Sequence, residues 1–395
     1  MNREELLKRI YDVEEHVKSM RGWLHQHPEL SDKEFETSKY LLAEVERIGL
    51  PVTMIDHVSF YVTLDTGRPG HVVGIRADMD ALPMEESENN LIGSKKWVSL
   101  NKEASHTCGH DAHMAMLIGT MEVLNSIKDE LSGKIYFLFE QGEEIGTGIK
   151  AMLDAIKDLG IEAIYATHLK SNIPTGLLCL EEGPKMAGAV VVEFEVKGKG
   201  GHGSRPDLSI NPLFATAQVL TALGTAWSNR INVEETVTLG LTQIHGGSLN
   251  NIIPDSCYVG GSLRYYNRAE ADHAVEVLKN TIIHTAKAHY CEADVSKIRI
   301  GTTPVINDAK VSAIVEKTVE SLIPGHLVKG VKWYASESFA QYSKIAPICF
   351  AFLGIANEAL GSGAEHHNVC FDVDEDAFKY GVAGAVSFAV GYLES

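Results

Sequence analysis

The sequence predicts an α/β protein of two domains, in which a discontinuous domain with a mixed, mainly parallel sheet carries a smaller inserted domain. Three observations support this prediction. The chain has 395 residues, which is long for a single core and comfortable for two domains. Short apolar runs alternate with helical segments in the early and late parts of the chain. Between these parts the order of elements changes to strand, helix, two strands, helix and strand.

The first half of the larger domain begins with an amphipathic helix over the first ~50 residues, which is interrupted at HQHPELS and resumes in KEFETSKYLLAEVERIGL. Ser31 and Glu34 have the spacing of a capping box for the second helix. The runs VVGIRAD, KIYFLFE and AIYATHL are apolar enough to be strands covered on both faces. Helical segments lie between these runs, namely HMAMLIGTMEVLNSI and GIKAMLDAIKDLG. This alternation predicts a largely parallel sheet, and ligands usually bind at the carboxyl edge of such a sheet.

The inserted domain is predicted over residues 187–303. AVVVEFEVKGKG has the alternation of a half-exposed strand, and a helix, two strands, a long helix and a strand at EADVSKIRIGT follow it. This βαββαβ order is the ferredoxin-like arrangement. Helix and strand then alternate again in KVSAIVEKTVESL, ICFAFLGI and the closing helix. Residues 1–186 and 304–395 therefore form the larger domain.

The composition narrows the class of function. A net charge of −18 argues against nucleic acid or an anionic membrane as the main partner. No apolar run approaches the roughly 20 residues of a membrane-spanning helix. The charged, helix-periodic N-terminus does not resemble a signal peptide, and the six cysteines are scattered without a framework. We expect a cytoplasmic protein with reduced cysteines.

The segment SHTCGHDAHMAM contains Cys108 and His110, and a Cys-x-His pair alone is more often structural than metal-binding. Here, however, further strand-like runs end in potential ligands: Asp78, Asp80, Glu143, Glu144, His168, His366 and His367. Imidazole, thiolate and carboxylate are donors that divalent zinc or manganese takes. Parallel strands would bring these groups into one crevice, and burying them without a cation would be costly. The pattern predicts a metal centre.

The pair Glu143 and Glu144 directly follows the run KIYFLFE. At a strand-to-helix turn, one carboxylate can bind a metal while its neighbour faces the metal-bound water. A metal lowers the pKa of that water to about 7, so a nearby carboxylate can take its proton. Without the preceding apolar run, a solvated pair of glutamates on a loop would be the better interpretation.

The chain resembles the M20 metallopeptidase superfamily, and within it the M20D amidohydrolases, which include N-acyl-amino-acid and auxin-conjugate hydrolases. The resemblance runs nearly end to end. The motifs that carry it are HPELSDKEFET, IRADMDALP, HTCGHDAHMAMLIG, GEEIGTGIKAML, GKGGHGSRP, HGGSLNNIIPD and HHNVCFDVDED. It implies a catalytic α/β domain and an inserted lid that commonly dimerises, so we expect a homodimer formed through the lid.

The resemblance also implies roles for the candidate ligands. The metal ligands would be Cys108, His110, Glu144, His168 and His367, with Cys108 bridging two divalent ions. These would be zinc or manganese, with cobalt and nickel as alternatives. Glu143 would be the general base, and Asp80 stands where the superfamily keeps an aspartate near the metals.

The lid would supply three further residues. His202 matches a histidine that reaches the active site of the partner subunit, where it can polarise the scissile carbonyl. Asn251 resembles a residue that contacts substrate, and Arg264 could hold a substrate carboxylate with its guanidinium group. Without the resemblance, His202 would be an exposed loop residue and Arg264 a surface arginine.

The leading hypothesis is metal-dependent hydrolysis of the amide bond of an N-acyl amino acid or a related small conjugate. Dipeptidase or carboxypeptidase action within the superfamily is the second enzymatic alternative. A third makes Cys108 a thiol nucleophile paired with His106 or His110. A non-enzymatic alternative is a metal-binding homologue that has lost catalysis.

The chain departs from the family pattern at several loops. They are Gln141-Gly142 before the glutamate pair, Val369-Cys370 after the C-terminal histidines, Ser338, and the whole segment between DALP and Ser105. None of these departures removes a proposed ligand. Loops of this kind shape a substrate pocket, so they bear on substrate choice.

Overall fold

A computed structural model describes residues 2–395, and the chain divides into two compact units. One comprises Met1–Lys185, Ile306–Val331 and Gln341–Ser395, and the other comprises Met186–Val305 and Lys332–Ala340. The short segment Lys332–Ala340, which the sequence assigns to the larger domain, thus belongs to the second unit. Backbone hydrogen bonds connect this segment to the second unit, since the N–H of Ala187 donates to the carbonyls of Trp333 and Ala335.

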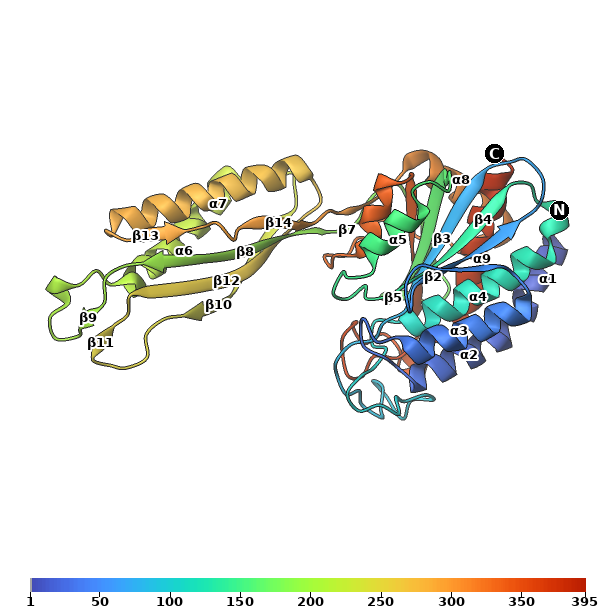
Figure 1. Ribbon diagram of the computed structural model, residues 1–395, viewed down its shortest axis with the longest axis horizontal. Helices are drawn as coiled ribbons and strands as arrows, with labels where there is room; N and C mark the ends of the chain where they lie inside the picture. Colours follow the sequence, from blue (N-terminus) through green and yellow to red (C-terminus); the bar gives the residue numbers. More distant parts are fainter. Residues whose placement is uncertain (1) are drawn as a thin grey trace. The chain divides into compact units, whose positions relative to one another are not determined.

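The first unit contains a seven-stranded mixed sheet in the order β1-β2-β4-β3-β5-β16-β6 (Figure 1). The central strands are parallel, β3 to β4 and to β5, and β5 to β16, whereas β1, β2 and β6 pair antiparallel at the edges. The predicted mixed α/β sheet is confirmed, and its bounds are β1 (Val52–Met54), β2 (Phe60–Asp65), β3 (Val72–Asp78), β4 (Lys134–Glu140), β5 (Ala163–Pro174), β6 (Leu178–Cys179) and β16 (Ile348–Ala356).

Helices α4 and α9 pack on strands β3 and β5, α2 and α3 pack on α4, and α8 packs on α9. The one N-terminal helix expected before HQHPELS is in fact two helices that meet at Val13. No helix within residues 2–395 combines the length and apolarity needed to cross a bilayer. The helices of this unit are α1 (Arg3–Asp12), α2 (Glu14–Gln26), α3 (Phe35–Ile48), α4 (His110–Ser126), α5 (Ile149–Ile156), α8 (Ala309–Leu322) and α9 (Phe378–Leu393).

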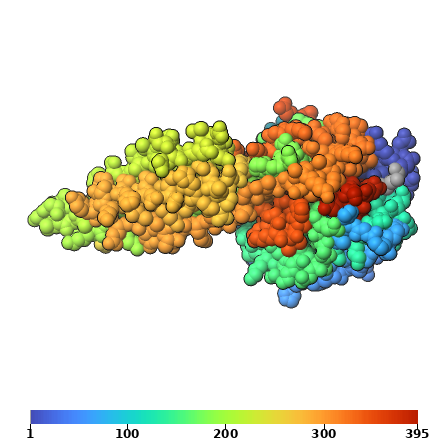
Figure 2. Space-filling view, turned by 90° about the horizontal axis from the view of Figure 1, so that it is seen from above, coloured from blue at the N-terminus to red at the C-terminus, as the bar shows by residue number. Residues whose placement is uncertain are grey.

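The second unit is an antiparallel sheet in the order β10-β12-β8-β13, with β14 also paired to β8 and two helices packed on the sheet. This is the ferredoxin-like order predicted from the sequence. Figure 2 looks onto this unit from the side of its helices, whose atoms cover the visible face. Its main elements are β8 (Gly188–Lys197), α6 (Pro212–Arg230), β10 (Val237–His245), β12 (Ser256–Tyr265), α7 (Arg268–Ala288), β13 (Glu292–Asp294) and β14 (Arg299–Thr302).

The last strand expected in this unit, over EADVSKIRIGT, is wrong as a single element. It is divided into β13 and β14, because the residues between them leave the strand and Ile298 N–H donates to the carbonyl of Val295 in a turn. The remaining short elements are β7 (Gly183–Met186) paired with β15 (Val305–Asn307), β9 (Gly201–His202) paired with β11 (Ile252–Ile253), and the 3₁₀ helices Lys128–Glu130, Pro206–Leu208, Ser338–Lys344, Glu358–Leu360 and Glu375–Ala377.

The expected capping box of α3 is also wrong. The N-cap of α3 is Glu34, whose side chain makes no capping hydrogen bond, and Oε2 of Glu29 accepts the N–H of Thr37 in the first turn instead. The Ser31 hydroxyl instead donates to Oδ2 of Asp80 at 2.7 Å. Oε1 of Glu34 accepts the N–H of Gly142 at 2.8 Å, in the turn after β4. Both polar side chains therefore hold loops at the carboxyl edge of the sheet instead of the helix end.

Glu34 generates a prediction about pH. Burial raises the pKa of Glu34 to about 7, so the folded chain binds this proton more tightly than the unfolded chain does. The contribution of Glu34 to the free energy of unfolding then falls as pH rises from about 4.5 to about 7, by up to about 3 kcal/mol. In the presence of chelator, the difference in melting temperature between Glu34→Gln and the wild type should increase in favour of the variant as pH rises through this window. Above the window the difference should not increase further. Glu36→Gln, at an exposed position two residues on, is the control for the substitution itself and is measured at the same pH values. A difference between Glu34→Gln and the wild type that stays constant with pH would contradict the prediction.

Candidate metal centre

Most candidate ligands in the first unit come from the carboxyl side of its central strands and from the start of α4 with the residues just before it, and His367 lies in the loop after β16 (Figure 1). Asp78 is the last residue of β3, and Glu143 and Glu144 lie in the turn after β4. His168 lies within β5, and His110 is the first residue of α4. Because β3, β4 and β5 are parallel, these ends meet at one edge of the sheet.

Cys108 is shared by two sets of potential metal ligands. One set is Cys108, His110 and His168, and the other is Cys108, Glu144 and His367. In each set one donor atom per residue lies within 4.8 Å of all the others. Two sets that share one sulfur are the arrangement that a thiolate bridging two cations requires.

Hydrogen bonds fix how two of the imidazoles face this space. Nδ1 of His110 lies 2.9 Å from the carbonyl oxygen of Asp80 and therefore carries the donated proton. Its Nε2 is buried and has no hydrogen-bond partner. Nδ1 of His168 donates to the carbonyl of Leu169 at 2.7 Å, and its Nε2 lies 3.6 Å from Sγ of Cys108. Each ring thus turns its Nε2 toward the ligand set that shares Cys108.

Asp80 connects the His110 ring to the glutamate turn. Its Oδ1 lies 3.2 Å from Nδ1 of His110, and its Oδ2 accepts the N–H of Glu144 at 3.0 Å. Oε1 of Glu144 is buried without a hydrogen-bond partner, 3.4 Å from Nε2 of His367 and 3.8 Å from Nε2 of His110. Leaving such electron-pair donors unpaired in a buried space is costly, so this donor set fits divalent cations.

The charges around the donors lead to the same conclusion. Burial raises the pKa of the Cys108 thiol well above its usual range, and the neighbouring Glu144 adds to the effect. Burial lowers the pKa of His168, as do the nearby rings of His113 and His366, so this imidazole is neutral. Burial also favours a neutral His110, but Asp78 and Cys108 outweigh it and raise the pKa of that ring. The surroundings favour positive charge at this point, and a cation would stabilise the thiolate.

His367 has a backbone conformation that is uncommon for residues other than glycine. Its φ angle is +61°, in the left-handed region, which costs a residue with a side chain about 1–2 kcal/mol. Its N–H donates to the carbonyl of Thr107 at 3.0 Å, next to Cys108. The side chain is 49% exposed. Such strain persists where the surrounding structure over-determines it, and it is common at functional sites.

Glu143 lies close to the ligand sets. One of its carboxylate oxygens falls within 4.8 Å of donor atoms of both His110 and Glu144, and the residue is half-buried. This carboxylate can therefore reach a water molecule beside the ligands without being buried among them.

Two buried histidines support the ligands, and their exact contacts are not evident from the sequence. Nδ1 of His113 donates to Oδ1 of Asp78 at 2.7 Å, and its Nε2 accepts the N–H of Leu169 at 3.0 Å. Nδ1 of His366 donates to the carbonyl of Cys108 at 3.1 Å. The spacing of three residues from His110 to His113 would have indicated that they share a helix face. Nothing comparable distinguishes His366 from its neighbour His367.

The remaining candidates, His202, Asn251 and Arg264, belong to the second unit. His202 is exposed on β9, which pairs with β11, and the carbonyl of Asn251 accepts the N–H of Gly203 at 2.8 Å, so these two residues are neighbours. Arg264 lies near the other end of β12, eight residues after Ser256. At the rise of an extended strand this is roughly 27 Å along the sheet. Within the second unit, therefore, Arg264 does not lie near the pair of His202 and Asn251.

Comparison with known proteins relates this arrangement to a large group of hydrolases. The family model described as Peptidase family M20/M25/M40 matches residues 74–390. Thermostable carboxypeptidase 1 of Saccharolobus solfataricus is 31% identical, with 98% of each chain covered. An IAA-amino acid hydrolase of Arabidopsis thaliana is 31% identical over 95% of this chain and 84% of its own. N-acetylcysteine deacetylase of Bacillus subtilis is 32% identical over 95% of this chain and 97% of its own.

The fold has a solved counterpart. The crystal structure of a Bacillus subtilis protein described as a dinuclear metal-binding peptidase of the M20 family superposes with a TM-score of 0.85 and 27% identity. The comparison covers 97% of this chain and 99% of that one. The match of the family model over most of the chain, together with relatives of at least 30% identity along nearly its whole length, shows that the chain belongs to peptidase family M20/M25/M40.

Proposed function

We propose that this protein is a metal-dependent amidohydrolase that cleaves the amide bond of N-acyl amino acids or related small conjugates at a centre of two divalent ions. The observation that carries the proposal is the pair of ligand sets that share Cys108, in which His110 Nε2 and Glu144 Oε1 are buried without hydrogen-bond partners. The names of relatives, an IAA-amino acid hydrolase and an N-acetylcysteine deacetylase, support amide hydrolysis as the reaction.

The proposed ligands are Cys108, His110, Glu144, His168 and His367. Divalent ions held there would supply Lewis acidity, which lowers the pKa of a water molecule and polarises the substrate carbonyl. Glu143 takes the proton of the attacking water and later gives it to the leaving amine. A donor set of one thiolate, three imidazoles and one carboxylate suits zinc, and manganese is the second expectation.

The second unit would bind the substrate. Arg264 is half-buried, and its Nη1 donates to Oγ of Ser336 at 3.1 Å, so the guanidinium is oriented before a ligand arrives. A guanidinium in this state is suited to the carboxylate of the leaving amino acid. Asn251 would help to orient that carboxylate, and His202 would stabilise the negative oxygen that develops on the carbonyl.

The separation of these residues within the second unit supports a homodimer. Because Arg264 lies roughly 27 Å along β12 from Ser256, which is at the end of the strand nearer to His202 and Asn251, one copy of this unit cannot bring all three to the same small substrate. We propose that His202 and Asn251 serve the active site of a partner subunit, which approaches along the edge strand β10 and helix α6.

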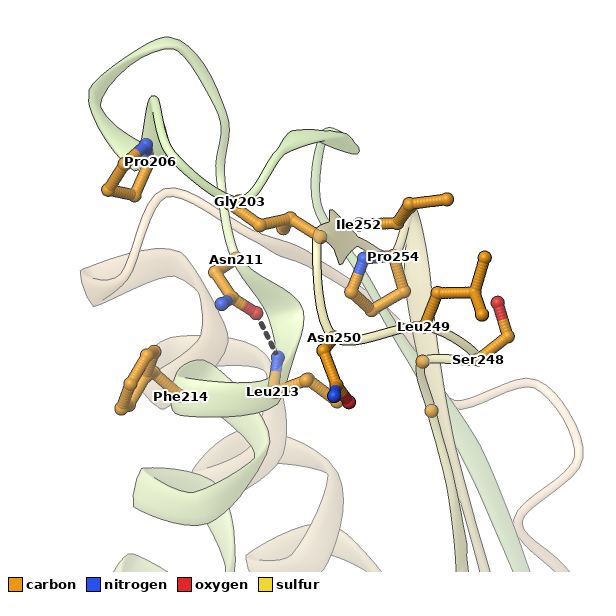
Figure 3. Close-up of a pocket in the computed structure, with 13 residues that line it drawn as sticks. Gly203, Pro206, Asn211, Leu213, Phe214, Ser248, Leu249, Asn250, Ile252 and Pro254 are labelled. Atoms are coloured by element: carbon orange, nitrogen blue, oxygen red, sulfur yellow. Dashed lines mark hydrogen bonds between the residues drawn. The ribbon is translucent and has the colours of Figure 1, made fainter.

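The surface of the second unit supports this arrangement. A cavity of about 650 Å³ opens beside the β9–β11 pair (Figure 3). Several apolar side chains around it are exposed, with Phe214 at 74% and Leu249 at 62%. Apolar groups of this size gathered on one surface are typical of a contact between subunits.

A carboxypeptidase is the second candidate, because the relatives in Saccharolobus solfataricus carry that name. We predict higher kcat/KM on acetyl-amino acids than on unblocked dipeptides or blocked peptides, measured side by side with metal-loaded protein. A preference for peptides would favour the carboxypeptidase. Activity that survives exhaustive chelation but is lost to a thiol alkylator would favour Cys108 as nucleophile, and no turnover with metal bound would indicate a silent homologue.

The base can be tested by Glu143→Gln, which removes the proton acceptor and keeps the size of the side chain. We expect kcat to fall by roughly 10²–10⁴-fold, the usual contribution of a general base. The metal content measured by elemental analysis should stay near that of the wild type, because Glu143 is not a proposed ligand. Glu85→Gln is the matched control and should retain full activity, because Glu85 is exposed and the charged group nearest to it in an ion pair is Nζ of Lys102 at 3.7 Å. Full activity of Glu143→Gln would remove Glu143 from the mechanism.

The shared site can be tested by mixing two inactive variants. Glu143→Gln lacks the base, and His202→Ala lacks the proposed contribution to the partner. When they are co-expressed in equal amounts, half of the dimers are mixed, and each mixed dimer has one intact site of two, so we expect about a quarter of wild-type activity. Activity no higher than that of the separate variants would mean that His202 acts, if at all, within its own chain.

A further inference from the structure

A continuous row of buried charged side chains runs through the first unit beside the candidate metal centre. It begins at Asp111, the residue after His110, whose Oδ2 lies 2.7 Å from Nδ1 of His25. Nε2 of the same ring lies 3.1 Å from Oε1 of Glu86. Oε2 of Glu86 in turn accepts Nζ of Lys95 at 2.6 Å.

The row ends at the segment that carries His367. Nζ of Lys95 donates to the carbonyl of Val369 at 3.0 Å, two residues beyond His367. The N–H of Ser87 donates to the same carbonyl at 2.9 Å. The row therefore connects Asp111, which follows the candidate ligand His110, to Val369, which lies close after the candidate ligand His367. These two residues are 258 positions apart in the sequence.

The side chains of this row are closed to solvent. Those of Asp111 and Lys95 are 0% exposed, and those of His25 and Glu86 are 1% exposed. A lysine is almost never buried to this extent unless it is paired. Glu86 and Lys95 also lie in the stretch between DALP and Ser105, where this chain departs from the pattern of its family.

Stability alone does not account for this row. A buried ion pair usually contributes no more stability than well-packed apolar side chains of the same size, because desolvation offsets the attraction. A row of charges does, however, fix positions sharply, since each member must keep its partners. The element in need of such restraint is His367, whose backbone has a positive φ and whose ring is only half-buried.

We propose that Glu86 and Lys95 are positioning residues, which hold the His367 segment in its left-handed conformation and couple it to the His110 segment through His25 and Asp111. This inference rests on the proposed function, since it assigns to the row the task of keeping one ligand of the metal centre in place. The ligand set it controls is Cys108, Glu144 and His367, whereas the set of Cys108, His110 and His168 has its own hydrogen bonds.

The test is the zinc affinity of purified apo protein, measured by competition with a chromophoric chelator and without any substrate. Lys95→Met removes the side-chain donor to the carbonyl of Val369 and leaves only the N–H of Ser87 there. It should weaken the binding of one of the two ions by roughly ten- to hundredfold, the usual effect of removing an outer partner of a ligand. The other ion should bind within about threefold of the wild type, because His110 and His168 keep their partners. Lys102→Met, in the same loop but 87% exposed, is the matched control and should bind both ions normally.

A second variant separates positioning from stability. In Glu86→Gln/Lys95→Met both charges of the pair are gone, so folding should recover if Lys95→Met alone is unstable. The lysine donor to the carbonyl of Val369 is still missing, so we expect the same ion to bind as weakly as in Lys95→Met. Recovery of both folding and full zinc affinity in the double variant would overturn the proposal, as would unchanged zinc affinity in folded Lys95→Met.

The two proposals fail in different ways. If the wild type does not bind two ions or does not hydrolyse N-acyl amino acids, the proposed function fails. If the wild type does both and Lys95→Met binds both ions as tightly, only the positioning role of Glu86 and Lys95 fails.

Discussion

The structure of the first unit depends on one electrostatic constraint, which is that several electron-pair donors are crowded into a space that is almost closed to water. Nε2 of His110, Oε1 of Glu144 and Sγ of Cys108 lie close to one another there. Such atoms repel one another, and the protein alone can lower this energy only by adding protons. Positive ions lower it further, so the crowding is itself the means of binding them.

The crowding is tolerated because each donor is held by a neighbour that is itself fixed. Asp80 orients the His110 ring and the backbone of Glu144, and the Ser31 hydroxyl holds Asp80 in turn. His113 and His366 hold the two sides of the Cys108 and His168 pair by backbone contacts. Outer contacts of this kind keep a site preorganised, so less conformational entropy is lost when a ligand binds.

Much of the fold could be predicted from the sequence, because apolar runs and helix periodicity directly reflect burial. The strands VVGIRAD and KIYFLFE correspond to β3 and β4, and the βαββαβ order of the second unit follows from the same patterns. The wrong predictions concern residues whose spacing suggests a local hydrogen bond but whose side chains bind residues far away in the sequence. Ser31 and Glu34 have capping-box spacing, yet they bind Asp80 and Gly142, which no local rule can indicate.

The candidate site was predictable to a different extent. Donor types at strand ends indicated a metal centre, and the resemblance supplied the choice among them. The supporting contacts were not predictable, because a histidine such as His366 is distinguished from His367 only by the direction of its ring. Likewise, the partnership of His25 with Glu86 and Lys95 brings together two separate parts of the chain, α2 and the loop after β3, that share no periodicity.

The alternation of β3 has a consequence for how this protein can change over evolution. Arg76, Asp78 and Asp80 occupy every second position, and each makes contacts at the same edge, with Glu140, His113 and His110 respectively. Inserting or deleting a single residue before Arg76 would turn all three toward the opposite face at once. The side chains that support the candidate metal ligands therefore depend on the register of this strand.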